Sequence, residues 1–173
     1  TLGIIHRSGE HLLRLINDVL DMSKIEAGQT TLKISGFDLW NTLKHLEAMM
    51  RVRAERKGLQ FTVTRASNVP QYITTDESRL RQALINLLDN AVKFTEEGGV
   101  TLRVTRDTFP MTRESGEHGR ETSGQRHPVA GIRFEIEDTG LGIAAEDVDS
   151  LFDAFVQTRR VGATTEGTGL GLA

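Results

Sequence analysis

The sequence predicts an α/β fold: a two-layer sandwich of a mixed sheet faced by helices, preceded by one long bundle helix. Three observations lead to this prediction. Apolar residues recur at helical spacing near the N-terminus, helix-start signals precede two further periodic stretches, and several short stretches alternate between apolar and polar residues. Helices and strands that follow one another in this way are typical of α/β domains.

The composition indicates a folded domain and argues against several classes of function. The chain has 173 residues, 38% hydrophobic and 26% charged, which suits one domain with a modest appendage. A net charge of -3 gives no reason to expect nucleic acid or an anionic membrane as a partner. Without cysteine there is neither a disulfide framework nor a thiolate metal site. The lack of cysteine fits a cytoplasmic domain, which is what we expect. No apolar run has membrane-spanning length, and any membrane anchor is expected in parts of the parent protein outside this chain.

Residues 1–28 are predicted to form an amphipathic helix. From Ile5 onward the apolar positions form a broad stripe, and Gly28 is placed to end the helix. A surface helix packed on its own domain is the alternative. So broad a stripe favours a partner helix in a bundle.

The sandwich itself is expected from residue 31 onward. Asp38 is the predicted N-cap of a helix that ends near Gly58, and Asp76 is the predicted N-cap of the next helix. Residues 107–128 are polar and poor in apolar side chains, which predicts a mobile hairpin insertion. Alternation predicts strands at 31–34, 60–65, 72–73, 100–105 and 131–137.

The helix after Asp76 carries two amides on one face. Asn86 and Asn90 are four residues apart, and Lys93 lies on the same side. The opposite side gathers apolar residues: Leu80, Leu84, Leu87, Leu88 and Ala91. A solvated polar face is the ordinary explanation for the amides. Two glycine-rich turns further along the chain, at 138–142 and 167–171, favour a ligand, because amide oxygens suit a hard cation and bare helix-start amides suit phosphate.

Together these segments resemble the ATP-binding domain of sensor histidine kinases, in the superfamily shared by gyrase, the heat-shock-90 chaperones and the MutL proteins. Residues 1–28 resemble the second helix of the dimerisation domain, and 31–173 resemble the catalytic domain, whose last helix and strands are expected after Ala173. The family's boxes correspond to 76–95 (N box), 138–142 (G1 box), 151–155 (F box) and 167–171 (G2 box).

The resemblance implies a site for ATP and Mg²⁺. Asn90 is the implied magnesium ligand, Asn86 is a possible second ligand, and Lys93 would meet the phosphate charge; these three are the implied catalytic residues. Asp138 is implied as a buried carboxylate that accepts from the adenine amino group, and Phe94 as an aromatic against the base. The other implied nucleotide-binding residues are Gly140, Gly142, Ile143, Phe155, Gly167, Thr168, Gly169, Leu170 and Gly171.

Each of these roles has a plainer alternative. Lys93 would otherwise be a surface lysine, Phe94 a core residue, and Asp138 part of an ordinary β-turn. The order and spacing of the boxes favour the nucleotide site over these readings.

Asn86 separates the branches of the superfamily. Related ATP hydrolases carry Glu at this place as a general base, and an amide cannot take that proton. The resemblance therefore implies a kinase that transfers the γ-phosphoryl group to a histidine and then to an aspartate on a response-regulator receiver domain. The alternatives are an ATP-hydrolysing conformational machine and a non-catalytic nucleotide-binding or dimerisation module.

The phosphoacceptor histidine of the family is followed by an acidic residue and, shortly after, by proline. None of the 5 histidines has this context: His6, His11, His45, His118 and His127. We therefore expect the acceptor upstream of Thr1, a homodimer formed through the 1–28 helix, and no kinase activity from this chain alone.

Overall fold

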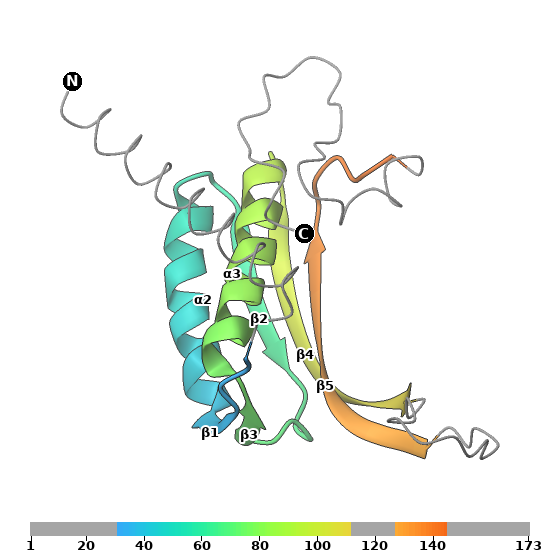
Figure 1. Cartoon of the computed structure of the whole chain (residues 1–173). Coiled ribbons are helices and arrows are strands. Elements are labelled where there is room, and N and C mark those ends of the chain that lie inside the picture. The colour runs from blue at the N-terminus through green and yellow to red at the C-terminus, as the bar shows by residue number, and fades with distance from the viewer. Residues whose placement is uncertain (1–30, 112–126, 145–173) are drawn as a thin grey trace. The chain divides into compact units, whose positions relative to one another are not determined.

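The computed structural model describes residues 31–111 and 127–144 (Figure 1). The expected helix at 1–28, the F box, and the G2 box lie outside the described residues. The described part holds, in order, β1 (Ser35–Asp38), α2 (Leu39–Glu55), β2 (Gln60–Arg65), β3 (Tyr72–Thr75), α3 (Glu77–Phe94), β4 (Gly99–Met111) and β5 (His127–Asp138). This mixed sheet with helices confirms the predicted α/β class. None of the described helices is both long and apolar enough to cross a membrane.

The chain divides into two compact units, which are described separately. The sheet unit comprises residues 38–73, 91–111 and 127–140 among those described. The amide unit, which carries Asn86 and Asn90, comprises 31–37, 74–90 and 141–144. Helix α3 contributes its last turn to the sheet unit and the rest to the amide unit.

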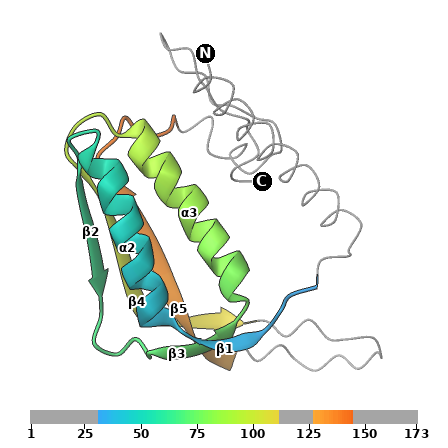
Figure 2. The ribbon, with the colours of Figure 1, turned by 90° about the vertical axis from the view of Figure 1, so that its left-hand side faces the viewer.

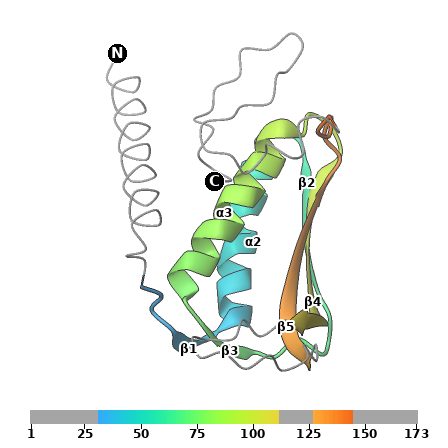
Figure 3. The same cartoon turned by 45° about the vertical axis from the view of Figure 1, so that its right-hand side comes forward.

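The sheet unit is built on three strands in the order β2-β4-β5. β2 is parallel to β4, with Phe61 opposite Val100, whereas β5 is antiparallel to β4, with Phe134 opposite Val104. Helix α2 packs against β2 and covers one face of the sheet, as Figures 2 and 3 show. The core that results contains Leu39, Leu43, Leu46, Met50, Ala54, Phe61, Val100, Leu102 and Val104.

The predicted N-cap of helix α2 is confirmed, whereas the C-cap is Arg56 and not the predicted Gly58. Asp38 is the N-cap, and its Oδ1 accepts from the N–H of Asn41 at 2.9 Å. Beyond the other end, Gly58 has φ +73°, a left-handed conformation that glycine adopts without strain. The boundaries of this helix therefore follow from local residues.

Strands β4 and β5 continue past β2 as a two-stranded ribbon, with Asp107 opposite Gly131. The predicted hairpin insertion at 107–128 overlaps this ribbon, since β4 includes 107–111 and β5 includes 127–128; residues 112–126 lie outside the described part. The ribbon is held by contacts that composition does not reveal. The ring of Phe109 covers Gly131, and Arg133 lies over that ring at 5.3 Å while its Nε donates to Asp107 at 2.8 Å.

The first predicted strand is displaced. The alternating stretch 31–34 forms no strand, and β1 begins at Ser35 and pairs with β3. Leu32 and Ile34 are 60% and 57% exposed, so the alternation there does not reflect a buried face.

Candidate functional site

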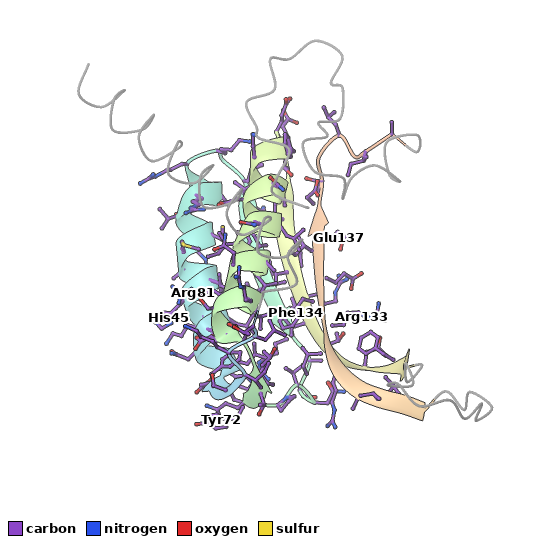
Figure 4. All side chains as sticks on the ribbon, in the orientation of Figure 1. His45, Tyr72, Arg81, Arg133, Phe134 and Glu137 are labelled. Atoms are coloured by element: carbon purple, nitrogen blue, oxygen red, sulfur yellow. The ribbon has the colours of Figure 1, made fainter. Side chains whose placement is uncertain are left out.

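Asp138 ends β5 on the apolar side of the strand. Side chains alternate along a strand, so Asp138 shares a face with Phe134 and Ile136. It stands opposite the buried Val100 on β4. Figure 4 shows Arg133 directed away from the side on which Phe134 lies. The alternation thus places a carboxylate where a core residue would otherwise stand.

The carboxylate of Asp138 is held through one oxygen. Its Oδ1 accepts from the N–H of Gly140 at 2.8 Å and lies 3.5 Å from the hydroxyl of Thr95. Its Oδ2 has no hydrogen-bond donor among the described residues. The side chain is exposed, so the predicted burial is wrong: Asp138 is the last residue of its strand, at the end of the sheet. The outcome is an oriented acceptor with one oxygen available.

Gly140 lets the turn after Asp138 approach the end of α3. A Cβ atom at this position would lie 2.7 Å from Oδ1 of Asp138 and 2.8 Å from the carbonyl oxygen of Phe94. Both distances are shorter than real Cβ contacts. The close approach therefore requires glycine.

Thr139 ties the same turn to the start of β4. Its hydroxyl donates to the carbonyl of Glu97 at 2.7 Å and accepts from the N–H of Gly99 at 3.0 Å. Gly98, at φ +91°, passes so close that a Cβ would lie 2.3 Å from this hydroxyl. Sequence reasoning singled out neither Thr139 nor Thr95. Their only local signal is position: Thr95 follows the last residue of α3, and Thr139 follows the acidic residue of the turn.

Lys93 and Phe94 form the end of α3 in the sheet unit. Lys93 is exposed, and its ammonium lies 5.0 Å from the centre of the Phe94 ring, within range of a cation–π contact. Phe94 is half-buried. An exposed cation and a partly accessible ring suit contacts with phosphate and base, and neither side chain is sealed in the core.

Asn86 and Asn90 lie one turn apart on the part of α3 in the amide unit. Both are half-buried. The Nε2 of Gln82 donates to Oδ1 of Asn86 at 3.2 Å, which orients that amide. The side chain of Asn90 makes no hydrogen bond to the described residues.

The apolar stripe of α3 is narrower than predicted. Leu84 and Leu88 are 2% and 0% exposed, as the helical spacing predicts. Leu87 is 41% exposed, so its assignment to the buried stripe is wrong. It lies at the edge of the stripe, where the helix turns toward its polar face.

The amides fit a magnesium ion as part of its ligand shell. The described residues contain no group of three or more His, Asp or Glu side chains that could hold a metal by themselves. Mg²⁺ in proteins commonly takes one or two side-chain oxygens and completes its shell with phosphate and water. Asn86 and Asn90 therefore suit a metal that arrives with a phosphorylated ligand.

The remaining predicted residues divide between the amide unit and the undescribed part. Gly142 has φ +71°, which explains glycine there, and Ile143 is 53% exposed. The others lie outside the described residues: Phe155, Gly167, Thr168, Gly169, Leu170 and Gly171.

Comparison with known proteins gives a consistent set of relatives. A family described as histidine kinase-, DNA gyrase B-, and HSP90-like ATPase matches residues 75–173. The chain is 42% identical, over 98% of its length, to the non-motile and phage-resistance protein of Caulobacter vibrioides. In Escherichia coli it is similar to the aerobic respiration control sensor protein ArcB (35%) and to the signal transduction histidine-protein kinase BarA (38%), over 99% of its length in each case. The chain spans 18%, 20% and 17% of these three relatives, respectively.

Solved structures show the same fold. The full-length protein ShkA, crystallised with AMPPNP, superposes with a TM-score of 0.71 at 35% identity, over 96% of this chain and 30% of that one. The Acinetobacter baumannii histidine kinase AdeS superposes with a TM-score of 0.63 over 94% of this chain and 64% of that one; at 24% identity, it supports the fold alone.

Proposed function

Because the chain belongs to the histidine kinase-, DNA gyrase B-, and HSP90-like ATPase family and resembles sensor histidine kinases in sequence and structure, we propose that it binds Mg·ATP for phosphoryl transfer. The γ-phosphoryl group passes to a histidine outside this chain, and then to an aspartate of a response-regulator receiver domain. In this proposal the protein acts as a homodimer through residues 1–28, and the domain works in the cytoplasm.

The observation that carries nucleotide binding is the oriented carboxylate of Asp138. One oxygen is held by the N–H of Gly140 at 2.8 Å, and the other lacks a donor among the described residues. A fixed acceptor of this kind pairs with the amino group of adenine. Guanine presents a carbonyl at that position, so two acceptors would face each other. The proposed ligand is therefore an adenine nucleotide.

The phosphate end of the proposal rests on the amides of α3. Asn86 and Asn90 would hold Mg²⁺, which would supply positive charge to neutralise that of the phosphates. Asn86 cannot serve as a general base for water. Phosphoryl transfer to a positioned histidine needs little beyond alignment and charge neutralisation, so this amide favours kinase chemistry over hydrolysis.

Base selection is tested at Asp138. Removing a hydrogen-bonded acceptor should weaken ADP binding about tenfold in Asp138→Ala, as measured by calorimetry. Glu137→Gln is the matched control, because it removes a neighbouring exposed carboxylate from the other side of the strand. Equal affinity of the unmutated protein for ADP and GDP would contradict the proposed base contact.

The phosphate end is tested at Asn90. We expect Asn90→Ala to lose most of the Mg²⁺-dependent part of ATP affinity. Unchanged ATP affinity together with unchanged kinase activity would contradict the proposed role of Asn90. The phosphorylated product distinguishes kinase activity from the rival function, ATP hydrolysis. Labelled ATP should yield acid-labile phosphate on the natural-length protein, and release of inorganic phosphate without any phosphohistidine would favour an ATP-hydrolysing machine instead.

A further inference from the structure

The C-terminal end of α3 has an unusual set of hydrogen-bond partners. The last four carbonyl groups of a helix have no partner within it, and in α3 these belong to residues 91–94. The carbonyl of Ala91 accepts from both the N–H and the hydroxyl of Thr95, at 3.0 and 2.8 Å. The carbonyl oxygen of Phe94 lies against Gly140, where a Cβ would be 2.8 Å away. The carbonyls of Val92 and Lys93 accept from a side chain elsewhere in the sheet unit.

Lys57 supplies the missing donors from another helix's end. Its Nζ donates to the carbonyls of Val92 at 2.8 Å, Lys93 at 2.9 Å and Thr95 at 2.8 Å. An ammonium has three N–H groups, so all of its donors are used. Its positive charge also opposes the negative end of the helix dipole. Lys57 is thus the C-terminal cap of α3, although it lies 35 residues before Val92 in the chain.

The backbone around Lys57 is itself fixed. The N–H of Lys57 donates to the carbonyl of Ala54 at 2.9 Å, and Gly58 turns the chain at φ +73°. The N–H of Gln60 then donates to the carbonyl of Gly98 at 2.9 Å. The segment that follows α2 therefore holds the segment that follows α3 at two points.

We infer that Lys57 is a positioning residue for the adenine end of the nucleotide site, an inference that rests on the proposed function. Lys57 fixes the backbone of Thr95, whose hydroxyl lies 3.5 Å from Oδ1 of Asp138. It also fixes the last turn of α3, whose final carbonyl lies against Gly140, and the N–H of Gly140 holds the same carboxylate. One ammonium therefore orients the base acceptor without touching the nucleotide.

The first test is Lys57→Met in the protein at its natural length. Loss of the charge-assisted bonds should raise the KM for ATP and the Kd for ADP about tenfold. The kcat at saturating ATP should change by less than about twofold, because bound nucleotide restores the geometry. Lys57→Arg should restore only part of the affinity, since a planar guanidinium cannot direct three donors to converging carbonyls. Lys44→Met is the matched control: it removes an exposed lysine of α2, and nucleotide affinity should not change.

The second test needs no nucleotide. Hydrogen exchange at the amides of Thr95 and Gly140 should accelerate in Lys57→Met and stay unchanged in Lys44→Met, with both variants folded by circular dichroism. Unchanged exchange, or an ADP affinity equal to that of Lys44→Met, would overturn the inference alone. An unmutated protein that binds no adenine nucleotide would overturn the proposed function and this inference with it.

Discussion

Helix α3 begins beside a carboxylate from its own stretch of sequence and ends beside an ammonium from the segment after α2. At the start, Asp76 accepts from the N–H of Arg79 at 3.0 Å through Oδ1 and from the N–H of Lys33 at 2.8 Å through Oδ2. At the end, Lys57 donates to three carbonyls, including those of Val92 and Thr95. The helix N–H that Asp76 serves lies three residues away, whereas the carbonyls that Lys57 serves lie at least 35 residues away.

Because the two caps differ in this way, we expect one end of α3 to affect mainly stability and the other to affect the geometry of the site. The bond of Asp76 to Arg79 forms with the helix, and its bond to Lys33 ties the first turn to a segment of the same amide unit. A cap contributed across 35 residues exists only when the sheet unit is folded, so it links the fold to the position of Asp138. Substitutions at the C-terminal end should therefore change ligand affinity, and substitutions at the N-terminal end should change stability alone.

The largest effect is expected for Gly140→Ala at the C-terminal end. The new Cβ would meet the carbonyl oxygen of Phe94 and the carboxylate of Asp138, so one of them must move. We expect a loss of about 1–3 kcal/mol in the free energy of unfolding, as for other overpacked sites. We also expect at least about a tenfold loss of ADP affinity, as for a lost hydrogen bond to a charged group.

Denaturant unfolding and calorimetry measure these two quantities. Gly36→Ala is the control, because a Cβ there has nothing within 4 Å. If Gly140→Ala and Gly36→Ala behaved alike, the close approach of the turn to α3 would be refuted.

Thr95→Val should have a smaller effect on both quantities. Thr95 is 0% exposed, and valine keeps its shape and its backbone bond to Ala91 while losing the hydroxyl. The single hydroxyl proton goes to the Ala91 carbonyl at 2.8 Å, and loss of this bond should cost about 1 kcal/mol of stability; loss of the longer 3.5 Å approach to Asp138 should weaken ADP binding by about threefold at most. Thr62→Val, at an exposed position of β2, is the control for added apolar surface. Unaltered ADP affinity would show that the Thr95 hydroxyl does not help to orient the carboxylate.

Local signals explain which parts of the fold were predictable. Asp38 and Asp76 were identified as caps because an aspartate before an apolar-periodic stretch satisfies helix amides nearby, and both are confirmed. Strand β2 was predicted with its correct bounds, since alternation there reflects a buried face. Strands β4 and β5 were predicted too short, because their ribbon depends on pairings such as Phe109 with Gly131 that appear only across strands.

The same division applies to the candidate site. The motif residues Asn86, Asn90 and Asp138 were identified from their order and spacing, whereas the groups that hold Asp138 were not. Lys57 precedes a helix-ending glycine and carries no local mark that separates it from a surface lysine. Its role depends on three carbonyls at least 35 residues away, and a local pattern cannot encode that distance.

Asp76→Ala tests the N-terminal end and should change stability without changing affinity. Loss of the cap leaves the N–H of Arg79 and of Lys33 without their acceptors, so the unfolding midpoint should fall by a few degrees. ADP affinity should stay within about twofold, because neither bond of Asp76 reaches the groups that hold Asp138. Asp76→Asn retains one acceptor oxygen and should lose part of this stability, because its NH2 group cannot accept the second N–H. A drop in ADP affinity as large as that of Thr95→Val would contradict the proposal that the N-terminal end of α3 affects stability alone.

Lowering the pH should weaken the N-terminal cap of α3 before the C-terminal cap, and this is the smallest of the expected effects. The N–H of Arg79, followed by that of Lys33, lowers the pKa of Asp76 below its ordinary value. A carboxyl with a lowered folded-state pKa contributes stability that is fully present above the unfolded-state pKa. That contribution is lost as the pH falls through the folded-state value, here below about pH 4.

The capping bonds of Lys57 at the other end involve no carboxyl group. Amide exchange, corrected for intrinsic rates, should therefore accelerate at Arg79 before Thr95 as the pH falls from about 5 to about 3. In Asp76→Asn the acid-dependent change at Arg79 should disappear, because the amide does not titrate. If Thr95 loosened first, or both amides loosened together in the unmutated protein, acid would be acting on the whole fold and not on one cap.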